Sequence, residues 1–533
     1  MRFAEKLKHH TISALLAGLV LCTGGVGSAQ TPMEIENCDI SFDPSVYNDE
    51  TLSLDGTTVA YRAYRSRVYV EHPENAAYQS MNIFVPMAYF EGGSINGYTA
   101  ATAPIFLPNG VGGYMPGEAS EPKEKDRMTG EANAALTALS RGYVVAAPAI
   151  RGRTTTDEAG VFVGKAPALI VDYKAAVRYL RHNKHRLPAG DTEKIISDGT
   201  SAGGALSALL GATGNSEDYA PYLRQIGAAE ERDDIFASAV YCPITNLEHA
   251  DMAYEWIFNG INDYHQSTLP KPPTAASAIA PTEDATPATQ NERPDNAPLD
   301  TKESVPMSEA AVSASAELKA MFPAYLNSLQ LYDTEGHSLT LDENGMGSFR
   351  EYIEDIYRAS AQEAADSGED LSEVPWLTLE NGRVTDVDLA AYAVWATRMK
   401  AAPAFDKFDL SSGENDEFGT RENAPRHFTQ FSQSHSEKGG AMADAEQIRL
   451  LNLLYYIGTK EVQTARHWRI RHGAKDRDTA MPVPAILSLK LQEAGCDVDF
   501  FSPWGQGHGG DYDLKQLFDW MDSICKVSAT KAQ

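Results

Sequence analysis

Residues 194–208 read KIISDGTSAGGALSA, and this stretch decides the fold. A short β-branched run precedes the pattern Gly-x-Ser-x-Gly, in which Gly199 and Gly203 flank Ser201, and small residues follow it. A serine becomes a useful nucleophile where a sharp strand-to-helix turn exposes its hydroxyl, and glycines two residues away leave room for the strained backbone. The pattern therefore predicts a nucleophile elbow. Small residues also cluster in ordinary loops, so the motif needs support from the rest of the chain.

A hydrolytic serine needs an acid and then a histidine further along the chain, each in a loop that follows a strand. Residues 467–478 read HWRIRHGAKDRD, a strand pattern followed by Asp476, and residues 498–503 predict another strand, after which GQGHGG contains His508. Considered alone, Asp476 would be interpreted as a turn residue and His508 as a polar loop residue. In this order they predict a triad in which Ser201 attacks, His508 is the base and Asp476 orients it.

Acyl transfer also needs two backbone N–H groups aimed at the oxyanion. In hydrolase elbows one belongs to the residue after the nucleophile, here Ala202, and the other comes from an early glycine-rich loop. Residues 103–117 read APIFLPNGVGGYMPG, a strand that runs into such a loop. The candidates for the second donor are Gly110, Gly112 and Gly113, and the alternative is an ordinary tight turn.

Strand and helix patterns alternate around the elbow. Residues 50–90 alternate apolar and polar side chains, which is typical of antiparallel strands. Residues 142–153 and 234–245 predict buried strands, and residues 168–183 predict an amphipathic helix. This alternation predicts an α/β fold with a mostly parallel central sheet flanked by helices on both faces.

Helical patterns replace strands after residue 245. Helices are predicted over residues 316–331, over 349–364 with a capping box of Ser348 and Glu351, and over 387–400. Residues 266–306 contain eight prolines among many Ala and Thr, a composition that predicts a flexible surface segment. The sheet resumes with a helix over 445–458. The predicted division is a signal peptide 1–29, a core 30–245, an inserted helical cap 246–440 and a second part of the core 441–533.

The first residues have the pattern of a secretory signal peptide. Arg2, Lys6 and Lys8 precede the apolar stretch 12–21, and small residues end at Ala29, where we expect cleavage. No other apolar run reaches the roughly 18 residues that cross a bilayer. We therefore expect a secreted protein, extracellular or periplasmic, with no membrane partner after cleavage.

The net charge of −29 arises from 74 acidic and 45 basic residues. Without a basic excess to neutralise phosphate, the chain is not expected to bind nucleic acid or an anionic membrane.

Removal of the leader leaves four cysteines: Cys38, Cys242, Cys496 and Cys525. Their spacing is not that of a metal site. In an exported chain they permit disulfides with three full connectivities, and a Cys38–Cys525 bond would join the two ends of the chain.

Six stretches together resemble the bacterial tannases of subtype B, esterases of galloyl and protocatechuoyl groups: PNGVGGYMPG, SDGTSAGGA, CPITNLEHADMAYEW, AFDKFDLSSGENDEFG, HWRIRHGAKDRD and GQGHGGDYD. The resemblance covers most of the mature chain apart from the proline-rich segment. It implies an α/β-hydrolase fold and the triad given above. It also implies that Lys400, Glu414 and Asp478 hold phenolic hydroxyls and that Ile244 packs against the aromatic ring.

The chemistry of these side chains fits that implication. Phenolic hydroxyls can donate to the carboxylates of Asp478 and Glu414, and Lys400 can donate to a phenolic oxygen. Without the resemblance, a surface salt bridge is the simpler interpretation of Lys400 and Glu414.

We therefore expect a secreted serine esterase that cleaves a small phenolic ester through an acyl-enzyme, with no metal ion or other cofactor. The alternatives are a feruloyl or general carboxylesterase on the same fold, a serine exopeptidase, and an inactive esterase-like binding protein. The sequence sets no oligomeric state.

Overall fold

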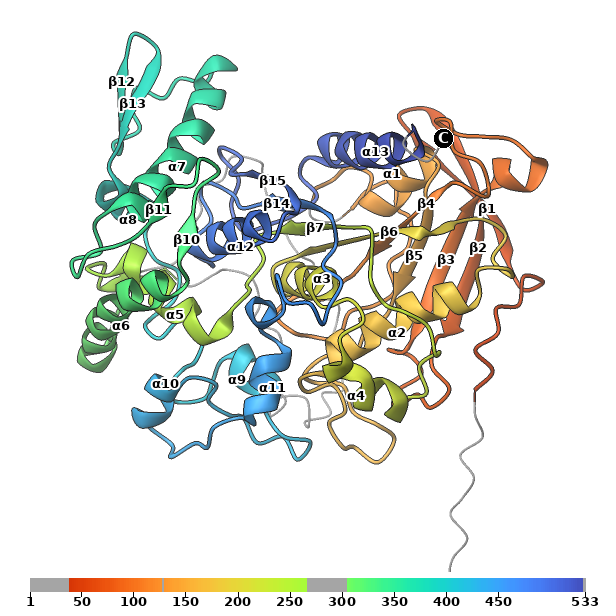
Figure 1. The fold of residues 1–533 in the computed structure, drawn as a ribbon, viewed down its shortest axis with the longest axis horizontal. Coiled ribbons are helices and arrows are strands. Elements are labelled where there is room, and N and C mark those ends of the chain that lie inside the picture. The colour runs from red at the N-terminus through yellow and green to blue at the C-terminus, as the bar shows by residue number, and fades with distance from the viewer. Residues whose placement is uncertain (1–37, 127–128, 266–303, 531–533) are drawn as a thin grey trace, which may run out of the picture. The chain divides into compact units, whose positions relative to one another are not determined.

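A nine-stranded sheet forms the centre of the computed structural model, which describes residues 38–126, 129–265 and 304–530 (Figure 1). The predicted signal peptide and all but the end of the proline-rich segment lie outside these ranges. The strands, in spatial order, are β1 (Asn48–Leu54), β2 (Thr57–Val68), β3 (Ser80–Pro86), β5 (Val144–Pro148), β4 (Pro104–Pro108), β6 (Asp191–Thr200), β7 (Ala237–Tyr241), β14 (His467–Arg471) and β15 (Asp497–Phe501).

The sheet is antiparallel at its beginning and parallel elsewhere. β1, β2, β3 and β5 pair antiparallel in that order, whereas β5, β4, β6, β7, β14 and β15 form a parallel series. Every residue of β3, β4, β5 and β7 is buried. Both faces of the sheet are covered, which is why β4 (PIFLP) and β5 (VVAAP) have unbroken apolar sequences. The prediction of a mostly parallel sheet is confirmed.

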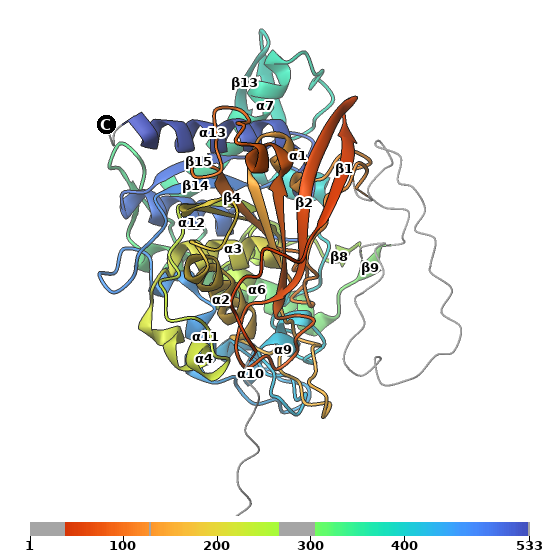
Figure 2. The ribbon, with the colours of Figure 1, turned by 90° about the vertical axis from the view of Figure 1, so that its right-hand side faces the viewer.

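Helices cover both faces of the sheet (Figures 1 and 2). On one face lie α1 (Ala134–Ser140) and α13 (Leu514–Thr530), and on the other lie α2 (Ala168–His182), α3 (Ala202–Ala212) and α12 (Pro482–Glu493). Among the described residues, no helix is both long enough and apolar enough to cross a membrane.

The chain between β7 and β14 is mainly helical. The predicted core and cap boundaries at residues 245 and 440 stay a prediction. Between β7 and residue 440 the described elements are α5 (Leu247–Phe258), β8 (Asp263–Tyr264), β9 (Val305–Pro306), α6 (Glu309–Ser328), β10 (Leu331–Tyr332), β11 (Ser338–Leu339), α7 (Ser348–Asp366), β12 (Leu377–Glu380), β13 (Arg383–Val387), α8 (Leu389–Ala396), α9 (Gly413–Glu417) and α10 (Gln430–Ser434). β8 and β9 pair antiparallel, so the end of the predicted flexible segment is a strand.

The helices predicted after residue 245 have different limits in the structure, and the one predicted over 316–331 is α6, which spans Glu309–Ser328. The capping box is wrong: α7 begins at Ser348 itself, whose hydroxyl donates to the Ser338 carbonyl at 2.9 Å and does not cap the helix. The helix predicted over 387–400 is shorter, because Val387 belongs to a hairpin and Asp388 caps α8 by accepting from two backbone N–H groups. Local patterns missed the hairpin because only four or five residues form each strand.

Two further expectations are also corrected. The helix predicted over 445–458 ends at Leu450 in α11 (Ala445–Leu450), and Asn452 then caps a separate turn of 3-10 helix (Leu453–Tyr455). The suggested Cys38–Cys525 bond does not form: all four cysteines in the described part of the chain are free thiols. Cys525 is buried within α13, whereas the Cys38 N–H is bonded to the Glu71 carbonyl at 2.9 Å.

Candidate active site

The strand, turn and helix around Ser201 have the backbone that an exposed nucleophile requires. β6 ends at Thr200, α3 begins at Ala202, and Ser201 between them has φ 60° and ψ −121°. A non-glycine residue in such a region costs about 1–3 kcal/mol and persists only where its surroundings hold it. A Cβ atom at Gly199 would lie 2.3 Å from the Gly203 carbonyl oxygen, so only glycine fits there.

The structure brings Ser201, His508 and Asp476 together. His508 Nε2 is 2.8 Å from Ser201 Oγ, and His508 Nδ1 is 2.9 Å from Asp476 Oδ2. Ser201 follows β6, whereas Asp476 and His508 lie in loops after the neighbouring strands β14 and β15. The carboxyl ends of these parallel strands share one edge of the sheet, which is why such distant residues meet. This is the arrangement in which an imidazole can accept the hydroxyl proton of a serine.

Asp476 is held in the ionised form. Its Oδ1 accepts from the N–H groups of Asp478 at 2.9 Å and Thr479 at 3.2 Å. Burial raises the pKa of Asp476, but the charge and the hydrogen bond of His508 outweigh burial and hold this pKa far below its usual range. The carboxylate can therefore accept from Nδ1–H, which leaves Nε2 free to act on the serine.

His508 is held as a strong base. Burial lowers the pKa of its imidazole, but the charges of Asp476 and Asp478 raise it well above its usual range. Asp478 contributes because its Oδ1 lies 3.9 Å from His508 Nε2. The imidazolium that forms when Ser201 loses its proton is therefore stabilised.

The glycine-rich loop after β4 is tied to the elbow by Asn109, the residue that precedes Gly110. Its side-chain amide lies 3.0 Å from the carbonyl oxygens of Asp198 and Gly203. Gly113 and Tyr114 have positive φ values of 53° and 58°, so the loop turns sharply beside the elbow. The roles of Ala202, Gly110, Gly112 and Gly113 as oxyanion donors stay a prediction.

The structure also places the candidate phenol-binding residues near the base. Lys400 Nζ lies 2.7 Å from Asp478 Oδ1, and these two side chains are 22% and 23% exposed. Glu414 is the second residue of the short helix α9 (Gly413–Glu417). Burial lowers the pKa of Lys400, but the charges of Asp478 and Glu414 outweigh burial and raise it. Ile244 is buried, and its N–H lies 3.5 Å from the Ser201 carbonyl. One partly exposed, charged surface therefore borders the hydroxyl of Ser201.

Helix α5 holds the segment that carries Lys400. Glu255 forms a fully buried ion pair with Arg398, and the Arg398 Nε–H donates to the Lys400 carbonyl at 2.7 Å. The Tyr254 hydroxyl accepts from the Met399 N–H at 3.1 Å and donates to the Arg477 carbonyl at 2.8 Å. The Lys400 segment and the loop of Asp476 and Asp478 are thus linked through one tyrosine.

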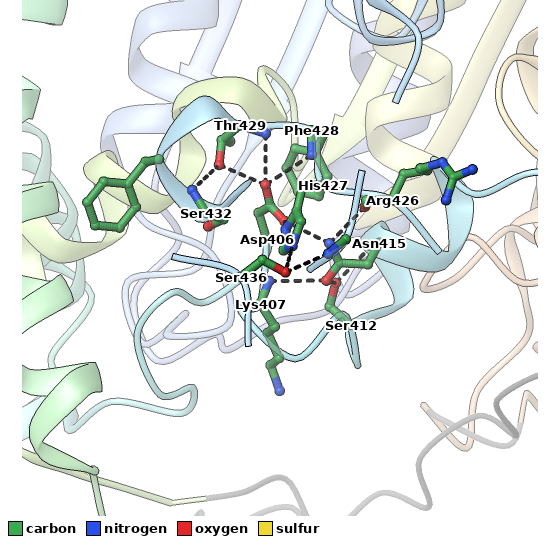
Figure 3. A network of polar contacts seen from close by, with 12 residues as sticks. Asp406, Lys407, Ser412, Asn415, Arg426, His427, Phe428, Thr429, Ser432 and Ser436 are labelled. Carbon is green, nitrogen blue, oxygen red and sulfur yellow. Dashed lines mark hydrogen bonds and ion pairs between the residues drawn. The ribbon is translucent and has the colours of Figure 1, made fainter. Parts of the chain in front are cut away.

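A second Ser–His–Asp arrangement lies in the same insertion (Figure 3). His427 Nδ1 is 2.8 Å from Asp406 Oδ1, and His427 Nε2 is 2.8 Å from Ser436 Oγ. Ser436 Oγ also accepts from the Gly440 N–H at 2.9 Å, and Asp406 is fully buried. No strand-to-helix elbow exposes this serine. The arrangement is a structural network that shapes the loop between Lys400 and Glu414.

Asp406→Asn is expected to lower the free energy of unfolding by about 3–5 kcal/mol, because it removes one partner of a buried charged network. The Asp406 carboxylate accepts from His427, Asn415, Phe428 and Thr429, and an amide nitrogen in place of one oxygen would face donors. Urea denaturation measures the change. The exposed variant Asp386→Asn is the control, and an equal effect in both variants would contradict the role of the network.

Two buried residues beside the candidate triad, His472 and Cys242, were not predicted as part of the site. His472 Nδ1 lies 3.6 Å from Asp476 Oδ2, and burial lowers the pKa of His472, which keeps it neutral. The Cys242 thiol donates to the Gly509 carbonyl at 3.0 Å, in the loop of His508. Neither residue belongs to a known motif. The one feature of the sequence that could have indicated a place in the site is that each residue lies near the end of a predicted strand.

Cys242 also bears on metal binding. Its sulfur, an Asp476 oxygen and a His508 nitrogen lie within 4.8 Å of one another, the one such group of three found in the described residues. A metal ion there would take the imidazole away from Ser201, so these residues fit a triad better than a metal site. The expectation of no metal or other cofactor stays a prediction.

Comparison with known proteins identifies the family. The BD-FAE family model matches residues 112–288, which include the elbow. The chain is similar to the tannin acyl hydrolase from Lactobacillus plantarum, with 46% sequence identity, coverage of 91% of this chain and 99% of that chain, and a TM-score of 0.82. It is similar to the tannase of Fusobacterium nucleatum with 47% identity, the same two coverages and a TM-score of 0.84. The chain belongs to the tannase family.

As a member of the tannase family, the chain has the α/β-hydrolase fold and is a carboxylic ester hydrolase. A further solved structure with 46% identity, a TM-score of 0.82 and the same coverages is a tannin acyl hydrolase in complex with ethyl gallate. Comparison with curated protein sequences gave no match.

Proposed function

We propose that this tannase is a secreted enzyme that hydrolyses galloyl and protocatechuoyl esters through an acyl-enzyme on Ser201. The observation that supports it most is the hydrogen-bonded chain from Ser201 through His508 to Asp476, which lies beside the Lys400–Asp478 ion pair. The similar enzymes solved with ethyl gallate and with 3,4-dihydroxybenzoate support the substrate class. Export is inferred from the leader sequence alone.

The reaction follows from the geometry of the triad. Ser201 Oγ attacks the ester carbonyl as its proton passes to His508 Nε2, and Asp476 stabilises the resulting imidazolium. The oxyanion is held by the Ala202 N–H and by one N–H of the loop that contains Gly110, Gly112 and Gly113. His508 then gives its proton to the leaving alcohol. A water molecule activated by the same imidazole releases the acid and restores the Ser201 hydroxyl.

Selection for phenolic acids is assigned to the charged surface beside the triad. Phenolic hydroxyls donate to the carboxylates of Asp478 and Glu414, Lys400 donates to a phenolic oxygen, and Ile244 packs against the ring. A site built to bond these hydroxyls rejects acids that lack them, because its own polar groups would lose their partners.

Lys400→Met tests this selection. We expect kcat/KM for methyl gallate to fall roughly 10- to 100-fold, the effect of about 1.5–3 kcal/mol for a charged hydrogen bond. The rate on p-nitrophenyl acetate, which has no phenolic hydroxyl on its acyl group, should change little. Lys438→Met, an exposed lysine of the same insertion, is the control.

Equal losses on both substrates would show that Lys400 does not recognise hydroxyls. A wild-type preference for methyl ferulate over methyl gallate would instead favour a feruloyl esterase.

A further inference from the structure

Two acidic side chains lie close to the triad in the sequence. Asp198 is on the segment that carries Ser201, and Asp511 is on the segment that carries His508. Asp198 is in β6, three residues before Ser201, and is 4% exposed. Asp511 is three residues after His508 and has a positive φ of 59°. A Cβ atom on Gly510 would lie 1.9 Å from Thr200 Oγ1, so the two segments are in direct contact at this point. An attractive contact between Asp198 and Asp511 would therefore hold the segment of Ser201 against the segment of His508.

The two carboxyl groups face each other. They lie within hydrogen-bonding reach of one another, and both line one cavity of about 290 Å³. The Oδ1 atoms of both residues are buried, and neither has a hydrogen-bond partner among the described residues. A buried polar atom without a partner costs about 1–3 kcal/mol, and more when it is charged. Two adjacent carboxylates cannot both ionise without strong repulsion, whereas a single proton satisfies both.

The charged surroundings relieve this repulsion only in part. The charge of Arg469 lowers the pKa of both acids, but two of its nitrogens donate to Asp513 and to the Tyr241 hydroxyl. Burial, followed by the charge of the neighbouring acid, raises the pKa of Asp198 well above its usual range, and burial together with Asp513 raises that of Asp511 to about 6. The titratable and charged groups that face the pair are Tyr173 on α2, Tyr241 on β7, Arg469 on β14, Asp513 before α13, and Glu121, Lys123 and Asp126 in the loop before α1.

We propose that Asp198 and Asp511 share one proton, and that this carboxyl pair is a positioning device that holds the segment of His508 against the segment of Ser201. The inference rests on the proposed roles of Ser201 and His508. Loss of the shared proton places two negative charges in contact and pushes the segments apart. The 2.8 Å contact between His508 Nε2 and Ser201 Oγ then lengthens, and the hydroxyl loses its base.

A divalent cation between the two carboxylates is the competing explanation. Calcium takes six to eight oxygen ligands. Among the residues that the structure describes, no third acidic, histidine or cysteine side chain has a ligand atom within 4.8 Å of both acids. A single proton, by contrast, satisfies both unpartnered oxygens without further ligands.

Asp198→Asn and Asp511→Asn test the proposal, because an amide donates one N–H to the remaining carboxylate at every pH. The measurement is the pH profile of kcat/KM for p-nitrophenyl acetate in the full chain. In the wild type we expect activity to fall about tenfold per pH unit above the pKa of the pair. In both variants this alkaline fall should be absent or move upward by at least about one pH unit. Asp55→Asn, an exposed turn residue, should behave as the wild type.

Thermal melting gives a second readout that does not depend on activity. A carboxyl whose pKa is raised by folding contributes stability at low pH that is lost as the pH rises towards the folded pKa. The melting temperature of the wild type should therefore fall, relative to that of either variant, as the pH rises from about 4, the ordinary pKa of an unfolded aspartate, towards the raised folded pKa.

Three outcomes would overturn the proposal: an alkaline fall that is the same in the wild type and both variants, variants that fold but are inactive at every pH, or calcium restoring the alkaline activity of the wild type alone. If one of the two variants, Asp198→Asn or Asp511→Asn, does not fold, the other variant provides the same test. If Ser201→Ala retained activity on p-nitrophenyl acetate, the proposed function would fail, and melting would still test the carboxyl pair.

Discussion

Ser201→Ala is expected to lower kcat for methyl gallate by about a million-fold, the loss seen when a serine nucleophile acting with its base is removed. Ser201 Oγ is the atom within 2.8 Å of His508 Nε2, and the elbow exposes it at a strained φ of 60°. The melting temperature should change little, because the backbone of the elbow is held by neighbouring contacts such as the bond from the Ser201 N–H to the Tyr241 carbonyl at 2.9 Å.

Labelling by a fluorophosphonate provides the direct measurement, since the reagent reacts with an activated serine. The wild type and Ser411→Ala, an exposed serine of the insertion, should be labelled, and Ser201→Ala should not. Activity of Ser201→Ala within tenfold of the wild type would remove Ser201 from the mechanism. An unlabelled and inactive wild type would favour a binding protein on this fold.

Asp476→Asn should cost about 10⁴-fold in kcat, because an amide in place of the carboxylate can donate to Nδ1 and so favours the wrong tautomer of His508. It should also move the acid limb of kcat/KM. In the proposed mechanism the neutral imidazole is the base, and the charge of Asp476 raises the pKa of His508. Without that charge the pKa falls, and the acid limb moves to lower pH.

The pH profile of the residual activity separates this role from a general loss of structure. Asp370→Asn, an exposed aspartate after α7, is the control and should keep both the rate and the profile of the wild type. An acid limb that stayed in place in Asp476→Asn would mean that another group sets the pKa of the base.

Local patterns predicted the sheet well because both of its faces are covered, so that strands such as β4 and β5 need unbroken apolar sequences. Prediction failed where tertiary contacts choose between local alternatives. Ser348 and Glu351 fit a capping box. In the structure, however, the Ser348 hydroxyl accepts from the Thr340 N–H and donates to the Ser338 carbonyl. The helix expected up to residue 400 ends at Ala396, after which Arg398 enters a buried ion pair with Glu255.

The sequence alone determined the order of the chemistry: a glycine-flanked Ser201, then an aspartate and a histidine after two strands, on a chain that alternates strand and helix. Distances and charges were decided by tertiary structure. No sequence pattern states that Asp198 faces Asp511, that Asn109 ties a loop to the elbow, or that Asp478 lies between Lys400 and His508. The physical reason is that strand order is set by packing across the whole sheet, whereas motifs are set by neighbouring residues.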